Sequence, residues 1–150
     1  MLRPLVLATA ICGTLDIAFA VLLTLWRDRE PADMLRFVAS GPFPQATAWG
    51  ASGSLLGLVV HFTLMSIMIA AFMIAARHFP VVLDQPLLSW LIFALVTYVA
   101  MNLVVVPLRF SGAWPPTPLS IGTQLFAHFF LVGLPTVLIS RHFFRTPAVG

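Results

Sequence analysis

Charged residues are scarce in this chain. They make up 9% of its 150 residues, whereas 60% are hydrophobic, and the mean hydropathy is +1.01. An average soluble domain is about one quarter charged and about half apolar. A soluble fold of this length has too little interior to bury so much apolar surface. Composition therefore predicts an integral membrane protein that forms a single domain, residues 1–150, with the lipid bilayer as its principal partner.

Lysine is absent, so all eight basic residues are arginine, and the net charge is +3. A nucleic-acid binder would cluster its basic residues on one face. Here the arginines stand singly at the ends of apolar runs, which is typical of anchors at a membrane interface. Nucleic acid is therefore not an expected partner.

Cysteine occurs once, as Cys12. This excludes an intrachain disulfide, a C-x-x-C-H haem attachment and a cysteine-based zinc site. Glycine-rich phosphate loops, nucleophile elbows and H-E-x-x-H motifs are also missing from the sequence. Soluble-enzyme functions are therefore unsupported, and an enzymatic activity is not the expected one.

Long apolar runs are what the chain does contain. A transmembrane helix needs about 20 mostly apolar residues, and four segments meet this requirement: 5–26, 54–76, 87–106 and 119–140. Thr117 and Pro118 form an N-cap and first-turn signal for the last segment. Pro107 is expected to end the third helix, and Pro135 to kink the fourth. The predicted fold is an all-α bundle of four transmembrane helices.

The first loop is the only connection with room for a further element. Residues 31–40 are expected to form a short helix that ends at Gly41, with an apolar side. Such a helix either has a role of its own, lying on the bilayer or covering the bundle, or is an ordered connector, and the sequence does not choose between these two interpretations.

The orientation of the chain is not decided by its arginines. Four of them fall on each side of the predicted membrane, so the positive-inside rule gives no preference. The side that holds both chain ends carries Arg3, Arg77, Arg141 and Arg145.

Candidate functional residues are the few polar groups inside the apolar spans. Asp16 lies near the middle of the first span, where a charged residue costs roughly 2.5–3.5 kcal/mol on insertion scales, so it must face protein. Small residues beside it, including Gly13, allow close helix contact. His61 continues a row from Gly53 and Gly57, which is also a pattern suited to tight packing.

The other two spans carry polar stripes of their own. Tyr98 and Asn102 lie one turn apart on the third span, and Gln124 and His128 lie in i, i+4 register on the fourth. At the helical rise per residue, Asn102, His61, His128 and Asp16 share a depth of roughly 6 to 15 Å below the first-loop side. This common depth predicts one intramembrane polar site, in which His61 and His128 could share a proton, a metal ion or a haem. The alternative is that these residues only form hydrogen bonds between helices.

Several short motifs in the second half resemble the YagU-like family of small bacterial inner-membrane proteins. They are His61-Phe62, Arg77-His78-Phe79-Pro80, Met101-Asn102 before Val106-Pro107, Trp114-Pro115-Pro116 and Ala127-His128-Phe129-Phe130. The resemblance covers about residues 53–145 and implies a multi-pass protein of a bacterial inner membrane with both termini in the cytoplasm. It implies no reaction, because the family has no established mechanism. The first loop and the tail are shorter than in the family.

Three functions fit these residues. The favoured one is a proton- or ion-linked channel or transporter, since intramembrane ionisable residues commonly mark such paths. A chain of this length is small for alternating access, so this function implies a channel-like pore or a homo-oligomer. The second is a structural or partner-binding membrane protein, and the third a b-type haem protein with His61 and His128 as axial ligands. No cofactor is the leading expectation.

Overall fold

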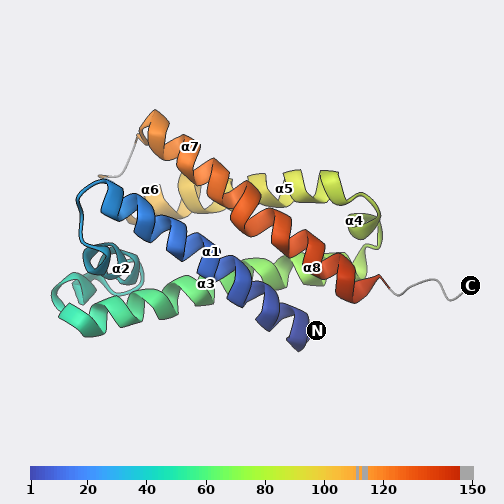
Figure 1. Ribbon diagram of the computed structural model, residues 1–150, viewed down its shortest axis with the longest axis horizontal. Helices are drawn as coiled ribbons and strands as arrows, with labels where there is room; N and C mark the ends of the chain where they lie inside the picture. Colours follow the sequence, from blue (N-terminus) through green and yellow to red (C-terminus); the bar gives the residue numbers. More distant parts are fainter. Residues whose placement is uncertain (111, 113–114, 146–150) are drawn as a thin grey trace, which may run out of the picture.

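The computed structural model describes residues 1–110, 112 and 115–145, and these residues form helices and no strand. Trp114 of the family-like motif lies outside the described residues. Figure 1 shows long helices running side by side, with the short helices at the two ends of the bundle. In chain order the elements are α1 (Leu2–Trp26), α2 (Pro31–Ala39), the 3₁₀ turn η1 (Pro44–Ala48), α3 (Gly50–His78), α4 (Val81–Asp84), α5 (Pro86–Tyr98), the π-helical segment η2 (Val99–Val105), α6 (Val106–Arg109), α7 (Pro118–Phe126), the π-helical segment η4 (Ala127–Gly133) and α8 (Leu134–Phe144).

Four helical stretches are long and apolar enough to cross a membrane. They are Leu2–Trp26, Gly50–His78, Pro86–Arg109 and Pro118–Phe144. The predicted all-α fold with four spans is confirmed. The Thr117 side chain accepts a hydrogen bond from the Ser120 backbone N–H at 3.2 Å, and Pro118 opens α7, as the sequence predicted.

The helices extend beyond the predicted spans. The second begins at Gly50 rather than at residue 54, and the fourth continues to Phe144. The third does not end at Pro107 but runs on to Arg109. Hydropathy marks where the apolar run stops, whereas backbone hydrogen bonding carries each helix further into the polar region.

Both prolines inside spans follow a π-helical segment. Pro107 comes two residues after η2, and Pro135 two residues after η4. In a regular α-helix a proline ring clashes with the carbonyl four residues before it. The i→i+5 pattern of a π-helical turn is wider, which explains how both helices continue through their prolines.

The first and last spans form the middle of the bundle. α1 packs against α3 on one side and against η4 and α8 on the other, while α5 packs against η4 and α8. Figure 1 shows α1 and the α7–α8 helix running side by side through the centre, with α3 on one side and α5 on the other. Leu22 and Leu55, more than 60% exposed, are typical of outward apolar side chains that a bilayer would cover.

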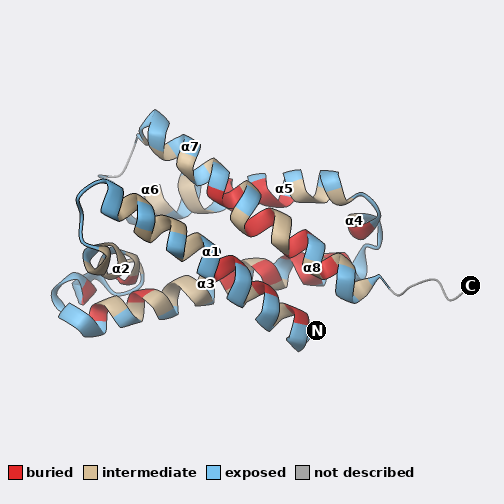
Figure 2. Cartoon of the chain, in the orientation of Figure 1, coloured by how far each residue is buried: buried red, intermediate tan, exposed pale blue. Residues whose placement is uncertain are grey.

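The core lies in the half of the bundle nearer the chain ends, here called the terminal end. Its fully buried side chains include Cys12, Ile69, Met73, Val132 and Val137. Figure 2 shows the buried residues gathered in this half, whereas the opposite half, the loop end, is mostly half-buried or exposed. α7 contributes to this difference, because none of its described residues is buried.

The short helix predicted in the first loop is present as α2. It packs against α3, where an added Cβ on Gly57 would overlap the backbone of Leu35 and one on Gly53 would overlap the carbonyl of Ala46. The two glycines therefore admit α2 and η1 rather than another span.

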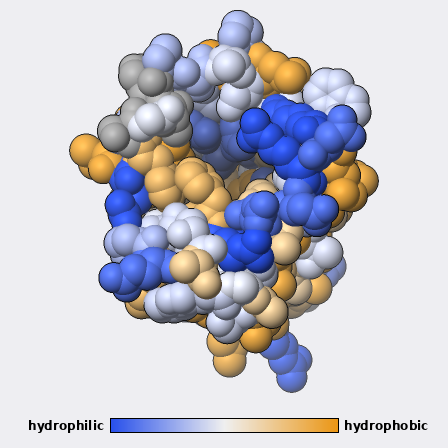
Figure 3. All heavy atoms as spheres, turned by 90° about the vertical axis from the view of Figure 1, so that its left-hand side faces the viewer, coloured by the Kyte–Doolittle hydropathy of each residue, from blue (hydrophilic) through white to orange (hydrophobic). Residues whose placement is uncertain are grey.

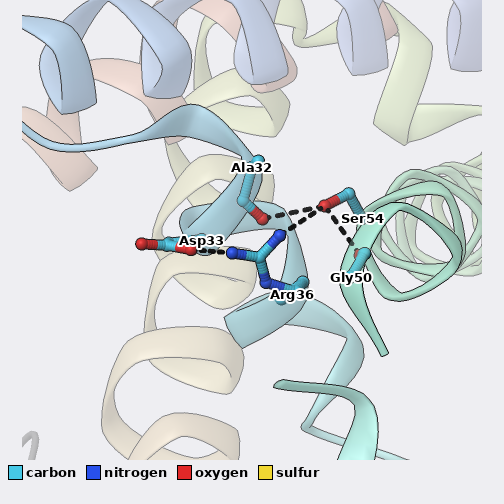
Figure 4. A network of polar contacts seen from close by, with 5 residues as sticks. All are labelled: Ala32, Asp33, Arg36, Gly50 and Ser54. Atoms are coloured by element: carbon cyan, nitrogen blue, oxygen red, sulfur yellow. Dashed lines mark hydrogen bonds and ion pairs between the residues drawn. The ribbon is translucent and has the colours of Figure 1, made fainter. Parts of the chain in front are cut away.

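Polar contacts fix α2 on both sides. Figure 4 shows Arg36 between Asp33 and Ser54, with the Ser54 hydroxyl donating to the Ala32 carbonyl at 3.0 Å. On the other side, the Arg109 guanidinium donates to the carbonyls of Ser40, at 3.0 Å, and Gly41. α2 is thus joined to two spans and covers part of the loop end.

Four spans place the two chain ends on the same side of a membrane. Reporter fusions at Arg3 and at Arg145 should therefore report the same compartment, and a reporter in α2 the opposite one. Paired alkaline phosphatase and fluorescent-protein fusions measure this directly. Opposite signals from the two ends would mean that one of the four helices does not cross.

Candidate functional site

His61 of α3 reaches across to α1 with both ring nitrogens. Its Nε2 lies 3.0 Å from the carbonyl oxygen of Gly13, and its Nδ1 lies 3.9 Å from Oδ2 of Asp16. A carbonyl oxygen can only accept, so Nε2 carries a hydrogen and donates it. The other ring nitrogen, Nδ1, faces the carboxyl group of Asp16. Gly13 allows α1 and α3 to come this close, since an added Cβ there would lie 2.5 Å from the ring of Phe62, the residue after His61 on α3.

At 3.9 Å, Nδ1 and the carboxyl oxygen lie within ion-pair range but are too far apart for a direct hydrogen bond. Two protonation states leave the pair without net charge: a neutral imidazole beside a carboxylic acid, and an imidazolium beside a carboxylate. Neither form leaves an uncompensated charge inside the membrane, where such a charge is costly. The side chains of His61 and Asp16 remain 12% and 26% exposed, so the pair lies at the border between the core and the more open loop end.

A second polar contact joins the same two helices nearer the terminal end. The Ser66 hydroxyl lies 3.3 Å from that of Thr9. Thr9, Gly13 and Asp16 recur at intervals of four and three residues, so they share one face of α1. We call this contact of α1 and α3 the α1–α3 seam: Thr9, Gly13, Asp16, His61 and Ser66.

His128 lies in a different set of contacts, formed with the third span. Its Nδ1 is 3.1 Å from the Thr97 hydroxyl, and its Nε2 is 3.3 Å from Nδ2 of Asn102. Asn102 Nδ2 also donates to the Tyr98 carbonyl at 3.3 Å, which fixes the orientation of the amide. The Tyr98 ring meets the His128 ring edge-on, with centroids 5.9 Å apart. We call these four residues the His128 group.

The hydrogen bonds assign the His128 tautomer. Because Asn102 donates to Nε2, that nitrogen has no hydrogen, so Nδ1 carries it and donates to Thr97. Thr97 in turn donates to the Phe93 carbonyl at 2.9 Å. Both ring nitrogens of this buried imidazole are therefore satisfied in its neutral form, as a structural role requires.

The single predicted site is thus two groups in the structure. Among the described residues no hydrogen bond joins the α1–α3 seam to the His128 group. Gln124 belongs to neither group, because it is exposed on α7. Equal depth fixes a position along the membrane normal but not the direction in which a side chain points.

Sequence reasoning did not identify Thr97, Ser66 or Thr136 as members of these interior contacts. Thr136 lies 3.4 Å from the Cys12 thiol and joins α8 to α1. Thr97 carried no usable signal in the sequence, because it stands five residues before Asn102. Residues at this spacing share a face only where the helix has π-helical turns, and such turns often occur at functional sites.

In this arrangement His61 and His128 offer no shared set of free ring nitrogens for a haem or a metal ion. An imidazole ligand binds iron or zinc through an unprotonated nitrogen. Nε2 of His128 accepts from Asn102, and Nε2 of His61 carries a hydrogen, which leaves only Nδ1 of His61, directed at Asp16. In the described part of the chain, no three His, Cys, Asp or Glu side chains converge.

A cavity with several charged residues in its lining opens at the loop end. Its volume is about 760 Å³, and it is lined by Thr24 of α1 and by charged residues of the first loop, among them Arg27, Glu30 and Asp33. Figure 3 faces this end and shows a hollow with hydrophilic residues on one side and hydrophobic residues on the other. Thr24 is eight residues from Asp16 along α1, about 12 Å at the helical rise per residue. The cavity therefore approaches the seam from the loop end without including its carboxyl group.

The fold and these groups define a multi-pass membrane protein with an ionisable pair inside its bundle. Comparisons of this chain with family models, with curated proteins and with solved structures find no match. Its function must therefore be argued from the residues of the seam.

Proposed function

We propose that this protein carries protons, or an ion coupled to protons, across a membrane along the α1–α3 seam. The observation that supports the proposal is the position of His61, whose Nδ1 lies 3.9 Å from the Asp16 carboxyl while its Nε2 donates to Gly13. The hydrogen bond from His61 to the Gly13 carbonyl would be sufficient to join α3 to α1. A carboxylic acid opposite the other nitrogen adds a site that takes up and releases a proton, at a depth where an ionisable residue is costly.

The path has an entrance and a second polar step. Protons enter from the loop-end cavity, which reaches Thr24, and pass to the Asp16–His61 pair. The hydroxyls of Thr9 and Ser66 continue the polar line toward the terminal end. The remaining gaps require water, side-chain movement or a second copy of the chain. A pore of this size therefore works as a narrow proton channel or as a homo-oligomer.

We further propose that the membrane is a bacterial inner membrane and that both chain ends are cytoplasmic. This part of the proposal depends on the resemblance to the YagU-like family. It gives the loop-end cavity a periplasmic position, so the seam would receive protons from the periplasm.

Proton flux into liposomes tests the function. Vesicles that contain the purified protein and an internal pH dye should acidify faster than empty vesicles under an imposed potential. Asp16→Asn keeps the shape of the side chain but removes the titrating group, so the rate should fall by about tenfold or more if the carboxyl is the relay. His61→Gln should fall similarly, since its amide still donates to Gly13 but cannot take up a proton.

Asp84→Asn is the matched control. It makes the same chemical change at an exposed carboxylate outside the spans, which pairs with Arg145 at 2.8 Å, and it should leave the flux unchanged. Wild-type flux no greater than that of empty vesicles, or an Asp16→Asn rate equal to the wild-type rate, would refute the proposal.

A structural or partner-binding role is the second candidate. Both ring nitrogens of His128 have hydrogen-bond partners, which favours a structural role for the His128 group. If the protein is only structural, both Asp16→Asn and His61→Gln will change its thermal stability but no vesicle preparation will conduct protons.

A further inference from the structure

The terminal end carries a cavity of its own, separate from the seam. Its volume is about 950 Å³, and it lies where α1 begins and where α3 and α8 end, beside the short helix α4. One part of its lining is apolar and includes Leu83, Phe143 and Phe144. The other part carries three arginines: Arg3, Arg77 and Arg145.

These arginines leave the cavity with an excess of positive charge. Asp84 is the carboxylate in the lining, and it pairs with Arg145 at 2.8 Å. Neither Arg3 nor Arg77 takes part in an ion pair among the described residues. Both are exposed, so they remain available to an anion. The planar guanidinium fork binds phosphate through two parallel hydrogen bonds, which an ammonium group cannot do.

The position of the cavity determines which anions can reach it. α1, α3 and α8 all have an end here, so the arginines lie where the apolar spans stop, at the level of lipid headgroups. The apolar part of the lining suits the glycerol and first methylenes of a lipid. Basic pockets between transmembrane helices are a known form of binding site for anionic headgroups.

We propose that this cavity binds a phosphate group, and that its apolar wall selects the phosphate of an anionic lipid over free phosphate. Arg3 and Arg77 hold the phosphate oxygens, and the lipid chains leave along Phe143 and Phe144 into the bilayer. The volume lies in the range of sites for small molecules. This inference does not depend on the proton pathway, because none of its residues belongs to the seam.

Thermal unfolding in detergent tests the site. Phosphatidylglycerol, titrated into the full-length protein, should raise the Tm, because a ligand that binds the folded state stabilises it by mass action. Phosphatidylcholine and inorganic phosphate should raise it far less. A basic side chain near an anionic surface contributes roughly a factor of five in affinity. The phosphatidylglycerol midpoint, which is the lipid concentration that gives half of the Tm increase, should therefore be about 25-fold higher for the double variant Arg3→Gln with Arg77→Gln.

Two further variants keep the test specific. Arg27→Gln with Arg29→Gln removes the same charge from exposed residues at the loop end and should leave the phosphatidylglycerol midpoint unchanged. Arg3→Lys with Arg77→Lys keeps the charge without the fork and should fall between the wild type and the glutamine variant, which also shows that the fold tolerates substitution there.

Each remaining outcome overturns part of the proposal. Equal midpoints for the two glutamine double variants would mean that phosphatidylglycerol binds by general charge attraction, not in this cavity. Protection by inorganic phosphate equal to that by phosphatidylglycerol would assign the site to free phosphate and refute its lipid specificity.

Discussion

Gly57→Ala is expected to lower the free energy of unfolding by about 1–3 kcal/mol, the usual cost of overpacking. The new Cβ would overlap the Leu35 carbonyl group, whose carbon would be 2.6 Å away. Backbone atoms cannot rotate aside as a side chain can, so α2 has to move off α3. The contacts that depend on its position, from Arg36 to Ser54 and from Arg109 to Ser40, would weaken with it. Thermal unfolding in detergent, together with trypsin cleavage at Arg36, measures both effects.

Two other glycines provide controls of graded severity. Gly122 has nothing within 4 Å of an added Cβ, so Gly122→Ala should be neutral or stabilising by up to about 1 kcal/mol through helix propensity. Gly13→Ala should be intermediate, because its Cβ would meet the Phe62 ring, which can rotate. If Gly57→Ala and Gly122→Ala shifted the Tm equally, the close packing of α2 on Gly57 would be refuted.

The four spans were predictable because the length of an apolar run is a local property of the sequence. The Thr117 cap and the short helix after Pro31 were predictable for the same reason, since capping and first-turn proline signals involve only neighbouring residues. The end of the third helix was not. Pro107 normally ends a helix, but the wide turns of η2 before it remove the clash, and the energy of a π-helical segment depends on the packing around it.

The candidate site was predictable only in part. Hydropathy and depth identified Asp16, His61, Asn102 and His128 as interior polar residues, and the structure places each in a hydrogen-bonded or ion-paired contact. Which residue meets which depends on the rotation of each helix and on the order of the helices in the bundle. Neither is encoded in the position of a residue along its own span.

Gln124 illustrates the same point. The i, i+4 register that placed it with His128 assumes a regular α-helix, but η4 begins at Ala127, between the two residues. Past that point the wider turns rotate the side chains, so the stripe does not stay on one face. Gly53 and Gly57 lie in close contact with η1 and α2, which are outside the spans and could not be inferred from span-to-span packing.

His128→Ala is expected to lower the free energy of unfolding by about 2–4 kcal/mol, because it creates a cavity and removes both hydrogen bonds of a buried ring. Asn102→Ala should cost less, since its amide is half-buried and makes long hydrogen bonds of 3.3 Å. If the His128 group is one network, the double variant will show a coupling energy of about 0.5–2 kcal/mol. Reversible unfolding in mixed micelles measures the free energy of unfolding for the wild type, the two single variants and the double variant.

The matched cycle pairs His128→Ala with His61→Ala. His61 bonds to α1 and His128 to the third span, with no common partner, so their effects should add within about 0.5 kcal/mol. His61→Ala should also abolish proton flux, whereas His128→Ala should change flux only as far as it lowers the folded fraction. A coupling between the two histidines as large as that between His128 and Asn102 would mean that the seam and the His128 group act as one site. The proton path would then cross the bundle interior instead of following α1 and α3.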